Sequence, residues 1–76
     1  MIPSNTVTIR AATVVTEGVT TIIAILTYLG PPQRQFHFGI QAGMDPTAGR
    51  VASIERRAIA QVVDQFILWA QNGKPA

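Results

Sequence analysis

This chain of 76 residues has six cationic side chains and four carboxylates, and its net charge is +2. The cationic residues are Arg10, Arg34, Arg50, Arg56, Arg57 and Lys74. Guanidinium groups bind carboxylates and phosphates in a planar, bidentate geometry. Arg50, Arg56 and Arg57 fall on the first half of the predicted helix, and arginine is a residue type enriched at binding hot spots. The set is sparser than the dense basic footprint that nucleic-acid binding usually needs.

The sequence holds no grouping of residues typical of catalysis. Metal sites need several clustered ligands, and His37 is the only histidine in a chain without cysteine. Neither serine lies near a base and an orienting group, which a nucleophile requires. The glycines do not follow the spacing of phosphate-binding loops. We expect a protein that is not an enzyme and that holds no metal or cofactor.

Three strands are predicted from runs of β-branched residues and from the turns between them. The first spans residues 6–15 and the second residues 20–29, with a three-residue hairpin loop, Thr16-Glu17-Gly18, between them. Gly30-Pro31-Pro32-Gln33 forms the second loop, because proline lacks the backbone donor that a central strand needs. The third strand begins at Arg34.

One helix is predicted to end at Gln71 and to begin either at Pro46 or near Arg50, because Gly49 lowers the helix propensity of the first turn. Asp45 is expected to cap its first turn, and Asn72-Gly73 to stop it. A wide apolar stripe recurs at helical spacing. Its members are Val51, Ile54, Ala58, Ile59, Val62, Phe66, Trp69 and Ala70.

The loop lengths set an expected register. Val15 would face Val19 across the first hairpin, and Leu29 would face Arg34 across the second. The helix would then cover one sheet face, with Ile9, Ala11, Ile23, Ile25, Thr27, Phe36, Phe38 and Ile40. The opposite face would carry Thr8, Arg10, Ile22, Ala24, Leu26, Tyr28, Gln35, His37, Gly39 and Gln41.

The middle strand is apolar on both sides, whereas one helix covers only one face of a sheet. An apolar patch left in water is larger than soluble monomers usually carry. We therefore expect a homodimer or larger oligomer. Its predicted interface is formed by Ile22, Ala24, Leu26 and Tyr28.

Three of the four carboxylates have simple structural explanations. Glu17 lies in a turn, Asp45 caps the helix, and Asp64 faces solvent on the helix. Glu55 falls near the centre of the apolar stripe, where an unpaired carboxylate is costly. It either reaches water or Arg34, or it marks a contact with another subunit or a basic target.

Two resemblances bear on function. The strands followed by a helix containing Arg56-Arg57-Ala58-Ile59-Ala60 resemble the second half of a double-stranded-RNA-binding domain, whose last helix opens with Lys-Lys-x-Ala-Lys. The stretch from Ala42 to Ala48, Ala-Gly-Met-Asp-Pro-Thr-Ala, leaves a strand and opens a helix. It resembles a junction in small phage-encoded inhibitors of bacterial defence, including anti-CRISPR proteins. This second resemblance implies a stoichiometric inhibitor that binds a host complex or sequesters a signal.

The sequence thus predicts a single α+β domain over residues 1–76, a β-β-β-α meander that acts by binding. A phage-type inhibitor of a host protein complex is the leading hypothesis. A small RNA- or DNA-binding protein and a structural subunit of a larger assembly are the alternatives. The residues expected to bind a partner are Arg10, Tyr28, His37, Arg50, Arg56, Arg57 and Asp64.

A cytoplasmic location is expected. No residue pattern requires an oxidising compartment, and the first residues lack the pattern of a signal peptide. The most apolar run, residues 19–29, is too short to cross a bilayer, which takes about 20 residues.

Overall fold

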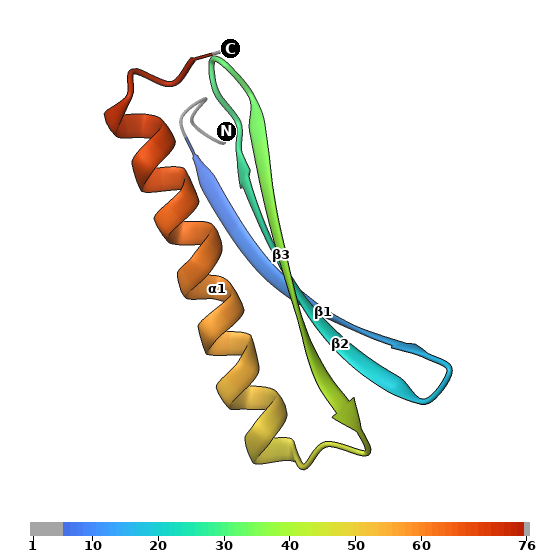
Figure 1. The fold of residues 1–76 in the computed structure, drawn as a ribbon. Coiled ribbons are helices and arrows are strands. Elements are labelled where there is room, and N and C mark those ends of the chain that lie inside the picture. The colour runs from blue at the N-terminus through green and yellow to red at the C-terminus, as the bar shows by residue number, and fades with distance from the viewer. Residues whose placement is uncertain (1–5, 76) are drawn as a thin grey trace.

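A computed structural model describes residues 6–75 as three antiparallel strands followed by one helix (Figure 1). The strands are β1 (Val7–Thr16), β2 (Val19–Tyr28) and β3 (Arg34–Met44), and the helix is α1 (Ala48–Gln71). The strand order is β1-β2-β3, so β1 and β3 are the two edges of the sheet. This arrangement confirms the predicted α+β fold with its β-β-β-α order.

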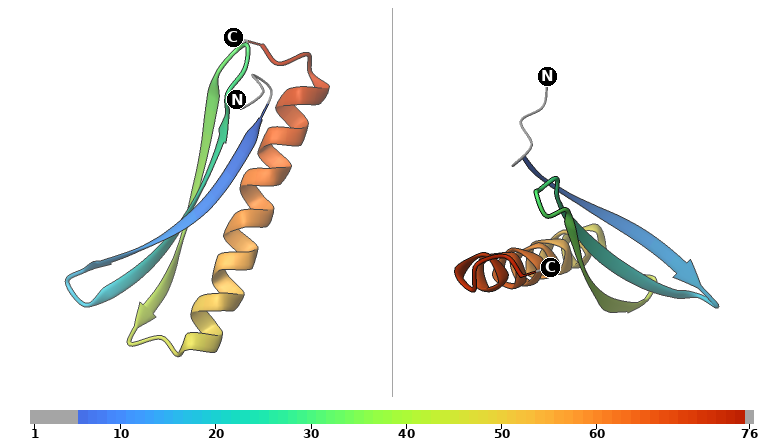
Figure 2. Two further views of the ribbon diagram at one scale, coloured as in Figure 1. Left: turned by 180° about the vertical axis from the view of Figure 1, so that it is seen from behind. Right: turned by 90° about the horizontal axis from the view of Figure 1, so that it is seen from above.

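The helix does not cover the sheet evenly. It packs mainly on β2 and β3 and touches β1 much less. In Figures 1 and 2 the tip of the β1–β2 hairpin projects away from the helix. On the face of the sheet that packs against α1, the helix therefore covers β2 but leaves most of β1 uncovered.

The first hairpin turn has two residues, and the predicted three-residue loop is wrong. Glu17 and Gly18 both have positive φ, at 52° and 81°. These values match a type I′ turn, whose twist suits an antiparallel hairpin. Thr16 therefore pairs with Val19, and the register differs by one residue from the predicted pairing of Val15 with Val19.

The second hairpin is also shifted by one residue. Arg34 pairs with Tyr28, where the sequence predicted Leu29. Because side chains alternate across a strand, a one-residue slip moves every side chain of β2 to the other face relative to its neighbours. The helix accordingly covers the even-numbered residues of β2.

The predicted oligomer interface is consequently the core of the monomer. Ile22, Ala24, Leu26 and Tyr28 lie under the helix and are at most 3% exposed. They form no open patch, and that part of the prediction is wrong. Their helix partners include Ile54, Ala58, Val62 and Trp69, which the sequence placed correctly on the apolar stripe.

The helix begins at Ala48, between the two predicted starts at Pro46 and near Arg50. Thr47 is the N-cap, and its hydroxyl oxygen accepts a hydrogen bond from the amide of Arg50 at 3.1 Å. Asp45 has a positive φ of 48° and lies in the preceding turn. The other end agrees with the sequence, since Asn72 caps the helix and Gly73 adopts a φ of 85°.

Candidate partner-binding site

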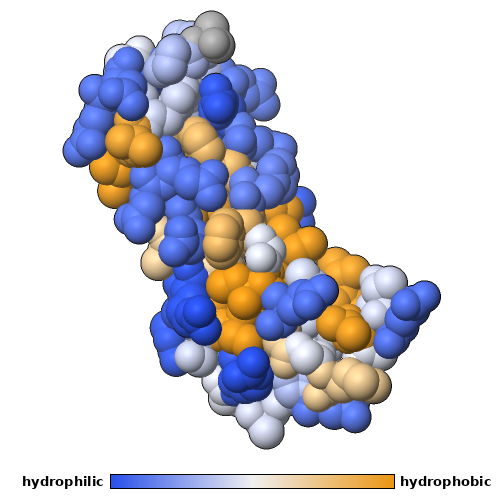
Figure 3. Space-filling model, in the orientation of Figure 1, coloured by the Kyte–Doolittle hydropathy of each residue, from blue (hydrophilic) through white to orange (hydrophobic). Residues whose placement is uncertain are grey.

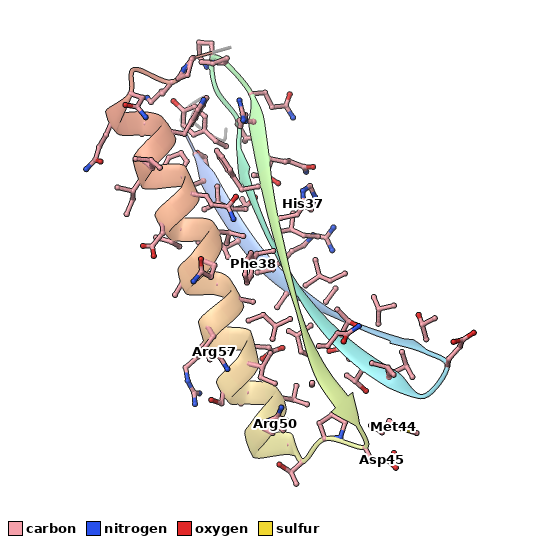
Figure 4. The ribbon with its side chains drawn as sticks, viewed as in Figure 1. His37, Phe38, Met44, Asp45, Arg50 and Arg57 are labelled. Carbon is pink, nitrogen blue, oxygen red and sulfur yellow. The ribbon has the colours of Figure 1, made fainter. Side chains whose placement is uncertain are left out.

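A hollow of about 290 Å³ lies between β3 and the neighbouring flank of α1. It is lined by Phe38, Ile40, Arg57, Ala60 and Gln61. Figure 3 shows an apolar strip on this side of the molecule, bordered by hydrophilic side chains. Figure 4 shows Phe38 between β3 and α1, with Arg57 on the adjoining part of the helix.

The strand and helix periodicities together build this hollow. Phe38 and Ile40 are two residues apart on β3, so both side chains point to the helix side of the sheet. Both remain half-buried because the strand is an edge. Arg57 and Gln61 are four residues apart and therefore share one flank of α1. An exposed guanidinium thus lies beside an apolar floor.

Two more predicted residues share this flank with Arg57. Arg50 and Asp64 lie seven residues before and after it, which is nearly two full turns. Arg50 also ties the helix start to the sheet, because its Nε donates a hydrogen bond to the carbonyl of Ala42 at 3.2 Å. The side chain of Arg56 is turned about 100° from that of Arg57 around the helix axis. The predicted arginine pair is therefore divided between two faces.

Arg10 and His37 form a separate group on the opposite face of the sheet. Both pair with Ile25, so the three side chains form one row across β1, β2 and β3. Figure 4 shows His37 directed away from the helix. The sequence correctly predicted that Arg10 and His37 share the open face. This face is separated by the sheet from Arg50 and Arg57.

Tyr28 is not on that open face, and its predicted position there is wrong. Its ring packs in the core, 5.7 Å from the ring of Trp69 and 5.5 Å from the ring of Phe66. The ammonium of Lys74 donates a hydrogen bond to its hydroxyl at 3.0 Å. Tyr28 therefore joins the C-terminal segment to the core.

Arg34 lies at the same end of the core and does not pair with Glu55. Its guanidinium carbon is 5.3 Å from the ring centroid of Phe36 and 5.6 Å from that of Trp69. Glu55 and Trp69 are separated by about 21 Å of helix at 1.5 Å per residue. Glu55 is half-buried.

Sequence reasoning missed four residues of the hollow as site residues: Phe38, Ile40, Ala60 and Gln61. The available signal was the helical spacing between Arg57 and Gln61. That spacing shows which residues share one side of the helix. It does not show which side will face β3, because this depends on how the helix packs on the sheet.

The hollow is suited to binding through contact. A guanidinium beside an apolar floor favours a carboxylate that lies next to an apolar side chain. Within residues 6–75, no three His, Cys, Asp or Glu side chains are grouped so that they could hold a metal ion. In the same range, no helix is both long and apolar enough to cross a membrane.

Comparisons with protein families, with curated protein sequences and with solved structures find no match for this chain.

Proposed function

We propose that the protein acts by stoichiometric binding, as a small phage-type inhibitor that occupies a surface of a bacterial defence complex. The observation that carries this proposal is the hollow beside β3, where exposed Arg57 adjoins Phe38 and Ile40. Arginine is enriched at binding hot spots, and aromatic side chains are enriched in protein interfaces. The partner would present a carboxylate beside an apolar side chain.

The positions of the basic residues favour a protein partner over nucleic acid. Arg10 lies on the outer sheet face, whereas Arg57 lies on the helix flank beside β3. One duplex could not contact both faces together. The helix arginines alone would neutralise few phosphates, and the affinity and salt dependence of binding scale with that number.

The proposal is tested with the whole chain as bait in lysate from bacteria that have an active CRISPR system, with and without nuclease. We expect a retained protein complex that resists nuclease and saturates at a fixed ratio in calorimetric titration. Arg57→Glu should weaken binding by about tenfold or more, as expected for a hot-spot arginine. Arg56→Glu is the matched control, because it makes the same charge change one residue away. Its effect should stay within about twofold, as for most surface substitutions.

Phage plating on the same bacteria tests the biological part of the proposal. Expression of the wild-type chain should raise plating on the immune strain, and Arg57→Glu should abolish the gain. Equal losses in the two arginine variants would show that the hollow is not the binding site. Capture that disappears with nuclease would favour the nucleic-acid alternative, and action at substoichiometric amounts would contradict inhibition by binding.

A further inference from the structure

The edge strand that α1 leaves uncovered, β1, carries exposed apolar side chains on both faces. Val7, Ile9 and Val15 are 37%, 43% and 64% exposed on the helix side, and Val14 is 43% exposed on the outer side. Natural edge strands are usually protected by charges, proline or bulges. β1 has no proline, a regular register with β2, and one charged residue, Arg10. This edge is therefore open to pairing with another strand.

The helix adds apolar surface above the same edge. Ile59 is two residues from Arg57, which places it about 200° away on the opposite flank of α1. Because Arg57 faces β3, Ile59 faces the β1 side, and Val63 follows four residues later. Both are packed against the core and remain partly exposed.

The backbone groups that are free at this edge belong to the odd-numbered residues of β1. The amide of Leu29 donates to the carbonyl of Thr6 at 3.1 Å, so Thr6 points its carbonyl toward β2. Backbone groups alternate in direction along a strand of an antiparallel ladder. Even-numbered residues therefore bond to β2, and odd-numbered residues, including Val7 and Ile9, point their N–H and C=O groups outward.

We propose that a second copy of this chain pairs with β1, antiparallel about Ala11, to form a six-stranded sheet. In an antiparallel ladder, two directly opposite residues either both point their N–H and C=O groups at each other and exchange two hydrogen bonds, or both point these groups away. Odd-numbered residues must therefore face odd-numbered residues, which puts both helices on the same side of the sheet. Val7 then lies opposite Val15 of the second copy, and Ile9 lies opposite Thr13.

The strand is complementary to itself in this register. Arg10 lies opposite Ala12 of the second copy. The Arg10 side chains of the two copies are therefore not directly opposite each other, and their like charges do not oppose pairing. The small side chain of Ala11 lies on the twofold axis, where two copies come closest. Pairing satisfies the free backbone groups and brings together the exposed Val7 and Val15 side chains of both copies. These features favour a second copy as the occupant over a strand from an unrelated protein.

Disulfide trapping tests the register, because the chain has no cysteine of its own. Ala11→Cys should form a disulfide-linked dimer on mild oxidation, since paired Cα atoms would be about 5.5 Å apart, within disulfide range. Ile9→Cys and Thr13→Cys should each fail alone, because identical residues would lie about 13 Å apart along the strands. A mixture of these two variants should cross-link. Gln35→Cys on the β3 edge is the control and should not.

Light scattering supplies the second measurement. The wild-type chain should be a dimer at high micromolar concentration. Ile9→Lys should be a monomer with native Trp69 fluorescence, whereas Gln35→Lys should remain a dimer. A monomeric wild-type chain would overturn the proposal, and so would a dimer unaffected by Ile9→Lys. Cross-linking through Gln35→Cys but not Ala11→Cys would assign self-association to the other edge.

Discussion

Replacing two neighbouring residues of β2 by alanine tests the register of the sheet. Leu26 is 1% exposed beneath the helix, whereas Ile25 lies on the outer face and is half-buried. The sequence pattern predicted the reverse arrangement. The Leu26→Ala and Ile25→Ala variants remove similar amounts of hydrocarbon from opposite faces, so their comparison isolates burial.

The expected magnitudes differ clearly. Leu→Ala in a packed core costs about 2–5 kcal/mol, because a cavity adds to the lost transfer free energy. Ile25→Ala should cost about 1 kcal/mol, since only part of that side chain leaves water on folding. A chain of this length has a total stability of roughly 4–11 kcal/mol. A loss of about 3 kcal/mol in Leu26→Ala would lower the Tm by roughly 12–24 °C.

Urea unfolding followed by tryptophan fluorescence measures both variants. Trp69 is the single tryptophan and is 7% exposed in the core, so its emission reports unfolding directly. Protein concentration must be held constant, because self-association makes apparent stability depend on concentration. An Ile25→Ala variant as destabilised as Leu26→Ala would refute the assignment of the even-numbered residues to the core.

Two further predictions concern the ends of the helix. Thr47→Ala should lower the free energy of unfolding by about 1 kcal/mol through loss of the N-cap, whereas Thr47→Ser should preserve it. An unchanged unfolding midpoint for Thr47→Ala in urea titrations would contradict the observed cap. Lys74→Met should cost about 1 kcal/mol, because it removes the donor to the Tyr28 hydroxyl, and an unchanged unfolding midpoint would show that this bond contributes nothing in solution.

Local signals in the sequence determined the kind and extent of each element. The predicted strands at residues 6–15 and 20–29 lie within one residue of β1 and β2, and the predicted helix end at Gln71 agrees with α1. Proline, glycine and hydrophobic periodicity act over a few residues, so they can be interpreted without knowing the rest of the fold. The apolar stripe of the helix was correct for the same reason.

The candidate site was only partly predictable. Arg57 was named from the sequence, but so was Arg56, which lies on another face of α1. Helical spacing separates the two side chains, yet it does not say which flank will face β3. That choice depends on the docking of α1 over β2 and β3, which also leaves β1 uncovered.

Tertiary structure alone decided which face of β2 became the core. Ile23 and Ile25 alternate with Ile22, Ala24 and Leu26, so both faces satisfy an apolar pattern. A turn of two residues in place of three then reverses the assignment, because side chains alternate with a period of two. The sequence determined that β2 has two apolar faces, and the packing of one helix selected the face that it buries.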